Sequence, residues 1–236
     1  MGHIYACADL HGVLGAWEQI VNFLQPDDKV FVLGDCTDRG PQPWQTLKAV
    51  LQEPRAILLK GNHEDMLIKV LCEYFSRGLP NYYDEMDLLN NGGGETYSSA
   101  LADPDVKSIL TRLSALPTHK EYINKGGERV FLSHAGFTPW TADFADIAIP
   151  APKDLIWDRD HILDDVDEDW VDNAVIVHGH TPIPLMPIVP RNAELHGAYW
   201  YAENRKVNID CGLVWIGETV LLDLDTWDEH IFETKW

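Results

Sequence analysis

The sequence predicts an α/β fold built on two sheets. Short apolar runs rich in β-branched residues alternate with helical periodicity between residues 4 and 74, the pattern of parallel β-α-β units. Further strand-like runs follow residue 119, which indicates a second sheet packed on the first. Neither a linker-like stretch nor an internal repeat divides the 236 residues, so we expect a single domain over residues 1–236.

The first sheet is expected to contain three strands, each followed by a helix. The strands are predicted at 4–8, 29–33 and 56–60, where apolar runs end at polar residues or glycine. The helices are indicated by apolar residues at i, i+3, i+4 and i+7. Their stripes fall on Trp17, Ile20, Val21 and Leu24, around Trp44, Leu47 and Leu51, and on Leu67, Val70, Leu71 and Tyr74.

The remaining elements follow a break in this pattern. Residues 76–100 are rich in turn formers and aromatic residues, so we expect a surface insertion or cap there. Asp103-Pro104 has the cap residue and first-turn proline of a helix start. A hairpin is predicted from 120–124 and 129–132 across Lys125-Gly126-Gly127, and later strands are predicted at 174–177, 207–209 and 219–224.

The charge and composition restrict the classes of partner. Acidic residues outnumber basic ones by 38 to 18, for a formal net charge of −20, so we expect no nucleic-acid partner. No apolar stretch approaches the length of about 18 residues that a membrane span needs, so no membrane partner is expected. The four cysteines form no CxxC pair and the start lacks a secretory pattern, which predicts a cytoplasmic location. No pattern predicts the oligomeric state.

Five polar clusters follow apolar strands, at the end of the strand where ligands gather in open α/β sheets. Their Asp, His and Asn side chains offer the oxygen and nitrogen donors that suit Mn²⁺, Zn²⁺ or iron. One such cluster alone is an ordinary turn, whereas five on separate strands favour a metal site. The clusters are Asp9-Leu10-His11-Gly12, the segment 34–40, Gly61-Asn62-His63-Glu64, Ser133-His134-Ala135-Gly136 and His178-Gly179-His180-Thr181-Pro182.

These blocks resemble the calcineurin-like metallophosphoesterases, and within them the phosphoprotein phosphatase family of the bacterial and phage lambda type. Of the signature blocks GDxHG, GDxxDRG and GNHE, the second and third are intact here as GDCTDRG and GNHE. Ala8 replaces the glycine of the first block, and Cys211 in IDCG stands where relatives often have threonine. The resemblance extends from Asp9 to Gly212. It implies a four-layer αββα sandwich of two mixed sheets flanked by helices.

The resemblance also implies two divalent metal ions, with Mn²⁺ favoured over Zn²⁺ or iron. Asp9, His11 and Asp35 would hold one ion, and Asp35 would bridge to a second ion held by Asn62, His134 and His180. His180 stands directly before Thr-Pro, as the ligand of the family does, and His178 is a neighbour or a replacement. Two such ions can lower the pKa of a shared water and hold a phosphoryl group for in-line attack. Their positive charge would attract phosphate despite the acidic surface.

The implied catalytic residues lie in the same blocks. His63 resembles the general acid of the family, which protonates the leaving alkoxide, and Asp38 would orient it. Arg39 and Asn62 would bind phosphate oxygens, together with Arg159 in the segment LIWDRD.

We therefore expect a phosphomonoesterase that acts on phosphoserine and phosphothreonine in proteins, with some activity on phosphotyrosine. Residues 90–96, NNGGGET, resemble the NGG-x-x-T segment of bacterial and phage serine/threonine phosphatases. One alternative is a hydrolase of diadenosine tetraphosphate or another dinucleoside polyphosphate, with a base stacked on Tyr82, Tyr83 or Tyr97. A non-catalytic scaffold is the other alternative, which the full set of implied ligands disfavours.

Overall fold

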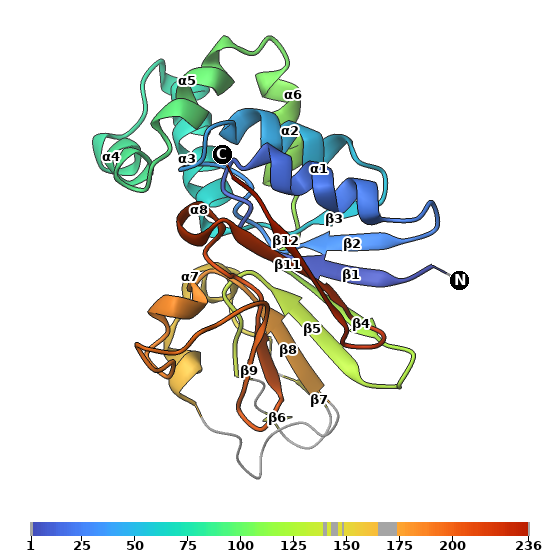
Figure 1. The fold of residues 1–236 in the computed structure, drawn as a ribbon. Coiled ribbons are helices and arrows are strands. Elements are labelled where there is room, and N and C mark those ends of the chain that lie inside the picture. Colours follow the sequence, from blue (N-terminus) through green and yellow to red (C-terminus); the bar gives the residue numbers. More distant parts are fainter. Residues whose placement is uncertain (1, 139–140, 143–145, 148, 165–173, 236) are drawn as a thin grey trace.

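Two five-stranded sheets face each other at the centre of the protein, with helices outside them (Figure 1). The computed structural model describes residues 2–138, 141–142, 146–147, 149–164 and 174–235. The strand orders are β12-β11-β1-β2-β3 and β4-β5-β8-β10-β9, and each sheet contains both parallel and antiparallel pairs. The predicted sandwich of two mixed sheets is therefore confirmed.

The first sheet contains the three predicted βα units. Its strands β1 (Ile4–Cys7), β2 (Lys29–Val32) and β3 (Ala56–Leu58) pair in parallel. The helices that follow them are α1 (Leu14–Phe23), α2 (Pro43–Gln52) and α3 (Asn62–Arg77). The predicted late strand β11 (Glu218–Asp223) joins the sheet antiparallel to β1, and β12 (Glu229–Glu233) pairs with β11 at the edge.

The second sheet begins with the predicted hairpin of β4 (His119–Ile123) and β5 (Arg129–Ser133). The strands β8 (Ala174–His178) and β10 (Lys206–Asn208) continue it in parallel, and β9 (Tyr199–Tyr201) closes it in the antiparallel direction. The short strands β6 (Thr141–Ala142) and β7 (Asp146–Ile147) form a separate pair. The sequence did not predict β6, β7, β9 or β12.

The predicted insertion at 76–100 is helical. It contains α4 (Tyr82–Asn90) and most of α5 (Gly94–Ala102), and α6 (Val106–Ser114) follows. The predicted helix start at Asp103-Pro104 is wrong, because α6 begins at Val106. Asp103 instead accepts hydrogen bonds from Trp44 and Lys48 of α2 and from the backbone N–H of Asp105.

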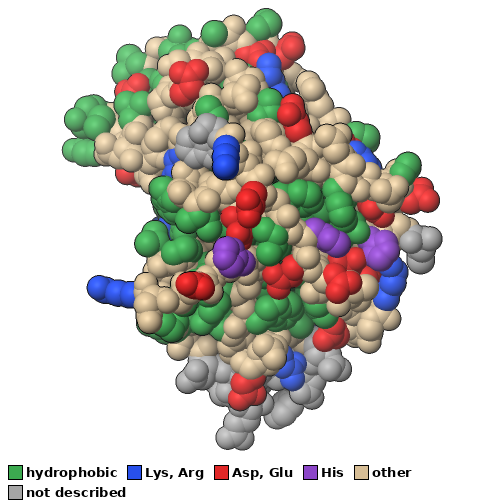
Figure 2. Space-filling model, in the orientation of Figure 1, with side chains coloured by type: hydrophobic (Ala, Val, Ile, Leu, Met, Phe, Trp, Pro, Cys, Tyr) green, Lys and Arg blue, Asp and Glu red, His purple; other side chains and the backbone are tan. Residues whose placement is uncertain are grey.

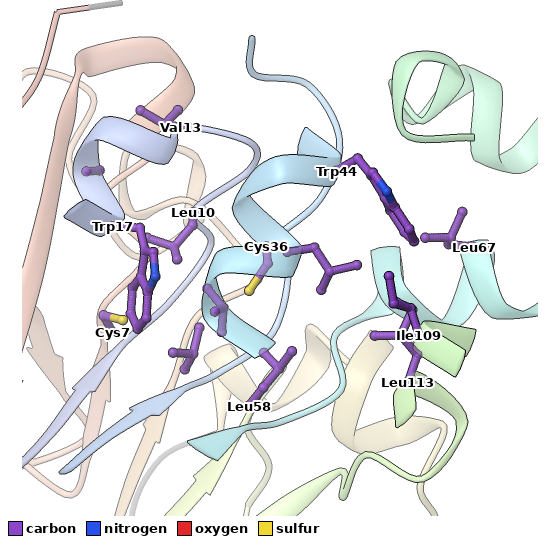
Figure 3. Close-up of a cluster of buried hydrophobic side chains, with 14 of the residues drawn as sticks. Cys7, Leu10, Val13, Trp17, Cys36, Trp44, Leu58, Leu67, Ile109 and Leu113 are labelled. Carbon is purple, nitrogen blue, oxygen red and sulfur yellow. The ribbon is translucent and has the colours of Figure 1, made fainter. Parts of the chain in front are cut away.

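Two apolar cores hold these layers together. Between the sheets, alternate side chains of facing strands pack against one another, among them Phe31, Leu132, Val177 and Leu222. On the other side of the first sheet, α1, α2, α3 and α6 bury a larger cluster, of which Trp17, Trp44 and Leu67 are part (Figure 3). The sheets thus form a stiff platform, and the loops at the ends of their strands are held in fixed positions.

The remaining short helices lie in the loops of the second half of the chain. They are α7 (Asp154–Trp157), η1 (Asp160–Leu163), η2 (Ile183–Leu185) and α8 (Leu213–Ile216). Acidic side chains are spread over the face drawn in Figure 2, as expected from the net charge. None of the helices in the described ranges is long and apolar enough to cross a membrane.

Candidate metal centre and catalytic site

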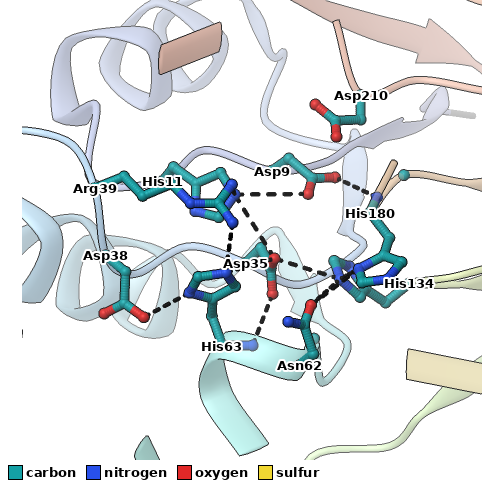
Figure 4. Close-up of polar contacts among 12 residues, drawn as sticks. Asp9, His11, Asp35, Asp38, Arg39, Asn62, His63, His134, His180 and Asp210 are labelled. Atoms are coloured by element: carbon teal, nitrogen blue, oxygen red, sulfur yellow. Dashed lines mark hydrogen bonds and ion pairs between the residues drawn. The ribbon is translucent and has the colours of Figure 1, made fainter. Parts of the chain in front are cut away.

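The five polar clusters predicted from the sequence meet at one place. Asp9 follows β1, Asp35 follows β2, Asn62 and His63 begin α3 after β3, and His134 and His180 follow β5 and β8 (Figure 4). Each of these six side chains is buried. The two sheets therefore contribute polar groups to a single buried site at the ends of their parallel strands.

The backbone at this site is held in conformations that non-glycine residues rarely adopt. Positive φ angles occur at six candidate residues, namely Asp9 (52°), His11 (39°), Asp35 (54°), Asp38 (70°), Arg39 (67°) and His180 (67°). Such angles cost of order 1–3 kcal/mol each and persist only where the surroundings impose them. Because several such residues occur together here, we infer that the rest of the fold offsets this cost and holds their side chains in the directions that the site requires.

One group of donor atoms lies around His11. The Nδ1 atom of His11 is 2.9 Å from the carbonyl oxygen of Thr37, so it carries the proton and Nε2 offers its lone pair to the site. That Nε2 lies 3.7 Å from Oδ2 of Asp35 and 3.9 Å from Oδ1 of Asp9. Oδ1 of Asp9 is buried and has no hydrogen-bond partner among the described residues. A cation between these atoms would satisfy it.

A second group lies around His134. Its Nδ1 is 2.7 Å from the carbonyl oxygen of Leu33, which again turns Nε2 toward the site. Nε2 lies 2.8 Å from Oδ1 of Asn62, 3.1 Å from Nδ1 of His180 and 3.4 Å from Oδ2 of Asp35. Atoms that act as electron-pair donors repel one another at such distances unless a proton or a cation lies between them. These donor atoms could therefore hold a metal ion.

Asp35 belongs to both groups. Its Oδ2 atom is among the potential ligands on the His11 side and on the His134 side, and its Oδ1 accepts a hydrogen bond from the backbone N–H of His63. The mixture of carboxylate, imidazole and amide donors fits two divalent cations that share one carboxylate.

Burial and neighbouring charges shift the pKa values of the histidines and carboxylates in the two donor groups. Burial lowers the pKa of His11 well below its usual value, and together with the charge of His134 it lowers that of His180 to about 2. Burial alone would raise the pKa of Asp35, but His134 and His63 outweigh it and hold that pKa well below the usual value. Asp35 is therefore ionised, and His11 and His180 are neutral, which is the form that binds metal.

His134 responds in the opposite direction. Burial is the largest single influence and lowers its pKa, but the carboxylates of Asp35, Asp9 and Glu64 together outweigh burial and raise the pKa to about 9. In the absence of a cation, a proton therefore occupies the space between His134 and its neighbours. Metal binding at this position would release that proton.

The predicted acid and its partner lie beside the His11 group. The Nδ1 atom of His63 is 2.6 Å from Oδ2 of Asp38, and both side chains are fully buried. The opposite ring nitrogen, Nε2, faces Oδ2 of Asp35 at 3.7 Å. Asp38 thus fixes the ring so that Nε2 points at the centre of the site.

Arg39 reaches the site from the next position along the chain. Its Nη1 donates to Nε2 of His11 at 2.7 Å and its Nη2 to Nε2 of His63 at 2.9 Å. The guanidinium also lies 5.7 Å from the centroid of the Trp215 ring. The fork of two N–H groups is therefore directed at the face of the site between the two histidines.

Two residues named from the sequence, His178 and Arg159, do not contact the two donor groups. His178 faces away from the donor groups: its Nε2 is 2.7 Å from the Tyr201 hydroxyl and its Nδ1 is 3.0 Å from the carbonyl oxygen of Gly179. The geometry therefore favours His180 over His178 as the ligand. Arg159 is exposed between α7 and η1, close enough for its charge to lower the pKa of His180. In the described part of the chain, no hydrogen bond or ion pair joins its side chain to the site.

Comparison with known proteins shows the family of the chain. The model of the calcineurin-like phosphoesterase family matches residues 2–215. The chain belongs to this family. A symmetrical bis(5'-nucleosyl)-tetraphosphatase of Paracidovorax citrulli is 29% identical over 145 residues, which cover 59% of this chain and 46% of that protein. The chain spans about half the length of the curated relatives it matches.

Solved structures of other phosphoesterases and phosphatases share the fold. A crystal structure described as a candidate diadenosine tetraphosphatase has a TM-score of 0.62 and 17% identity, over 99% of this chain and 94% of that one. A serine/threonine phosphatase from Saccharomyces cerevisiae with similarity to human phosphatase PP5 has a TM-score of 0.60 and 14% identity, over 100% of this chain and 81% of that one. At these identities the likeness establishes the fold alone.

The site of this calcineurin-like phosphoesterase also contains two acidic residues for which the sequence predicted no role. The Glu64 carboxylate accepts hydrogen bonds from the backbone N–H groups of Asp35, Cys36 and Gly61, at 2.8, 2.8 and 2.9 Å, and so shapes the loop that carries Asp35. Asp210 is buried near Asp9 (Figure 4), and its Oδ2 has no hydrogen-bond partner among the described residues. Their presence in the GNHE and IDCG blocks was the available signal.

Asp35→Asn is expected to abolish most metal binding, because it removes the one negative charge that both donor groups share. In the parent protein, Mn²⁺ at 100 times its Kd should add about 2.7 kcal/mol to the free energy of unfolding. We would measure thermal unfolding and calorimetric titration of the metal-stripped protein with Mn²⁺, using Asp27→Asn as an exposed control. Unchanged Mn²⁺ affinity in Asp35→Asn would contradict the assignment.

The metal-free protein should lose stability as the pH rises, in part through Asp210. Burial raises the pKa of Asp210 to about 7, the N–H of Gly212 opposes this shift and the charge of Asp35 adds to it. The folded state then binds more protons than the unfolded state between about pH 4 and about pH 7, so the free energy of unfolding falls across this range. Asp210→Asn should flatten the fall. Urea unfolding at several pH values measures it, and an equal slope in both proteins would rule this origin out.

Proposed function

We propose that this phosphoesterase is a dimetal-dependent phosphomonoesterase that removes phosphate from phosphoserine and phosphothreonine in proteins. The observation that carries the proposal is the orientation of His63: Asp38 holds its Nδ1, and its Nε2 faces the carboxylate shared by the two donor groups. A serine or threonine alkoxide is a poor leaving group, so its departure depends on a proton delivered from a fixed position. Phosphotyrosine, with an easier leaving group, is a secondary substrate.

The proposed ligands divide as the two donor groups do. Asp9, His11 and Asp35 would hold one divalent ion, and Asp35, Asn62, His134 and His180 the other. Mn²⁺ is the proposed metal, with Zn²⁺ or iron as alternatives, because mixed oxygen and nitrogen donors suit all three. When bound, the two ions would supply Lewis acidity and offset the charge of the phosphate.

The phosphate would be oriented by side chains of this chain. Arg39 now donates to His11 and His63 through its two terminal nitrogens. The same planar fork matches two oxygens of a phosphate dianion. If a bound phosphate accepted the two hydrogen bonds from Arg39, Nε2 of His11 would be available as a metal ligand and Nε2 of His63 would be available to carry the catalytic proton. Asn62, at the start of α3, and the exposed Arg159 are the other proposed phosphate contacts.

His63 would act as the general acid. Its Nε2–H would pass a proton to the departing oxygen as the bond between that oxygen and phosphorus breaks, while Asp38 stabilises the positive ring before transfer. The full burial of both side chains excludes water that would otherwise compete for these hydrogen bonds.

The second candidate is a dinucleoside polyphosphate hydrolase, favoured by the names of the curated relatives, which are symmetrical bis(5'-nucleosyl)-tetraphosphatases. Trp215, 59% exposed beside Arg39, could stack a base. The three tyrosines predicted for that role do not form a stacking site together. Tyr82 and Tyr83 are exposed on α4, and Tyr97 packs edge-on against Tyr74. A nucleotide leaving group also needs less help from a general acid than an alkoxide.

The proposed partner is therefore a phosphoprotein or phosphopeptide, with no nucleic acid or membrane. The net charge of −20 favours substrates that carry basic residues near the phosphate. The cytoplasmic location stays a prediction, in accord with four cysteines that are all unpaired in the structure.

The protein loaded with Mn²⁺ should hydrolyse phosphoserine and phosphothreonine peptides with a higher kcat/KM than diadenosine tetraphosphate. Phosphate release would be measured at matched substrate concentrations, with the metal-stripped protein as the control. A higher kcat/KM on the dinucleotide would keep the site and replace the substrate. If neither substrate showed metal-dependent turnover, the phosphomonoesterase proposal would be wrong.

His63→Asn should lower kcat on alkyl phosphates by about 10²–10⁴, the usual contribution of general acid catalysis. Aryl phosphates should lose less, because a phenolate leaves with little need of a proton. The comparison of kcat on a phosphoserine peptide and on an aryl phosphate measures this difference. Equal losses on both substrates would indicate that His63 binds the phosphate and does not donate a proton.

A further inference from the structure

A buried hydroxyl of helix α5 contacts the side chain that orients His63. Thr96 Oγ1 is hydrogen-bonded to Oδ1 of Asp38, and it also accepts a hydrogen bond of 3.2 Å from the backbone N–H of Asp38. Thr96 is 0% exposed, so water does not compete for these contacts. This helix belongs mostly to residues 76–100, which the sequence predicts to form a surface insertion or cap.

The two oxygens of Asp38 are thereby held from opposite sides. Oδ2 accepts from Nδ1 of His63 at 2.6 Å, and Oδ1 accepts from the hydroxyl of Thr96. A carboxylate that is fixed at both oxygens cannot rotate about its last bond without losing one partner. Removal of the hydroxyl would leave a buried oxygen of Asp38 unpaired and allow the carboxylate to turn away from His63.

The same segment also holds the backbone beside Asp38. Asp38 and Arg39 have consecutive positive φ angles of 70° and 67°, a turn that its surroundings must impose. Gly92 accepts a hydrogen bond of 3.3 Å from the backbone N–H of Arg39. A Cβ atom on Gly92, whose φ is +90°, would lie 3.1 Å from Cγ of Arg39, so glycine permits this close approach.

We propose that Thr96 is a positioning residue of the active site, and that residues 90–96 clamp the strained Asp38–Arg39 turn. The hydroxyl of Thr96 fixes Asp38, Asp38 fixes the ring of His63, and Gly92 fixes the backbone from which Arg39 extends. The role of His63 as a proton donor in this chain of contacts rests on the proposed phosphomonoesterase function. The clamp itself is independent of the substrate.

The test compares Thr96→Val, which keeps the shape and removes the hydroxyl, with Thr96→Ser, which keeps the hydroxyl. Ser98→Ala is the matched control, because the hydroxyl of Ser98 lies on the same helix and is bonded to the carbonyl oxygen of Gly94 at an exposed position. Thr96→Val should lower kcat on a phosphoserine peptide by about 10-fold or more, a part of the usual contribution of a general acid. KM should stay similar and kcat on an aryl phosphate should fall less. Thr96→Ser should restore most of the loss, and Ser98→Ala should have no effect.

A second readout needs no turnover. In the metal-stripped protein, the proton between Nδ1 of His63 and Asp38 should give a protected imidazole resonance in the nuclear magnetic resonance spectrum, assigned by its loss in His63→Asn. Thr96→Val should shift or broaden this resonance, whereas Thr96→Ser and Ser98→Ala should retain it. If Thr96→Val does not fold, Thr96→Ala removes the hydroxyl without the branched volume and takes its place.

The outcomes separate the inference from the function. An unchanged resonance together with parent-like kcat in Thr96→Val would overturn the positioning role. Equal losses of kcat on both substrates, with no rescue by Thr96→Ser, would also overturn it, because they indicate a general loss of packing. If the parent protein hydrolysed no phosphoester, the proposed function would fail, and the resonance alone would decide the role of Thr96.

Discussion

The buried carboxylate of Asp35 is the group on which the arrangement of the site depends. One of its oxygens faces histidines that follow strands of both sheets. The backbone N–H of Asp35 donates a hydrogen bond to the carboxylate of Glu64. A negative charge in such a place is stable only because imidazoles surround it at less than 4 Å. The positive φ angles, the close approach of Gly34 to Gly61 and the burial of Glu64 all serve to keep this charge in position.

The site also joins the two sheets. Asp9, Asp35 and Asn62 follow strands of the first sheet, whereas His134 and His180 follow strands of the second. The backbone N–H of His180 already donates to Asp9 at 3.0 Å, and Nδ1 of His134 already contacts the carbonyl oxygen of Leu33. Cations held by these side chains would add bonds between layers that apolar packing and these hydrogen bonds already join, so metal content and the stability of the sandwich would be coupled.

Most of the candidate site could be predicted because each polar block follows its own strand and the blocks are specific to the family. Asp9, His63 and His180, which belong to three of these blocks, come together in the structure. Contacts between distant segments could not be predicted from the sequence. No local pattern indicates that Thr96 contacts Asp38 or that Glu64 accepts a hydrogen bond from the backbone of Asp35. The strand β12 was not predicted because its residues alternate between exposed and half-buried. Helix α6 begins after the predicted start at Asp103 because the Asp103 side chain is hydrogen-bonded to Trp44 of α2.

The strand order of the first sheet has a consequence for the synthesis of the protein. The strand β1 has β2 on one side and β11 on the other, and His3 meets Asp223 across 220 positions of the chain. The edge of β1 that pairs with β11 therefore remains without its partner until the segment that contains β11 has also been made. During that interval the unpaired edge is open to wrong pairing with other chains, so we expect the late arrival of β11 to slow folding and to favour aggregation until the sheet is complete.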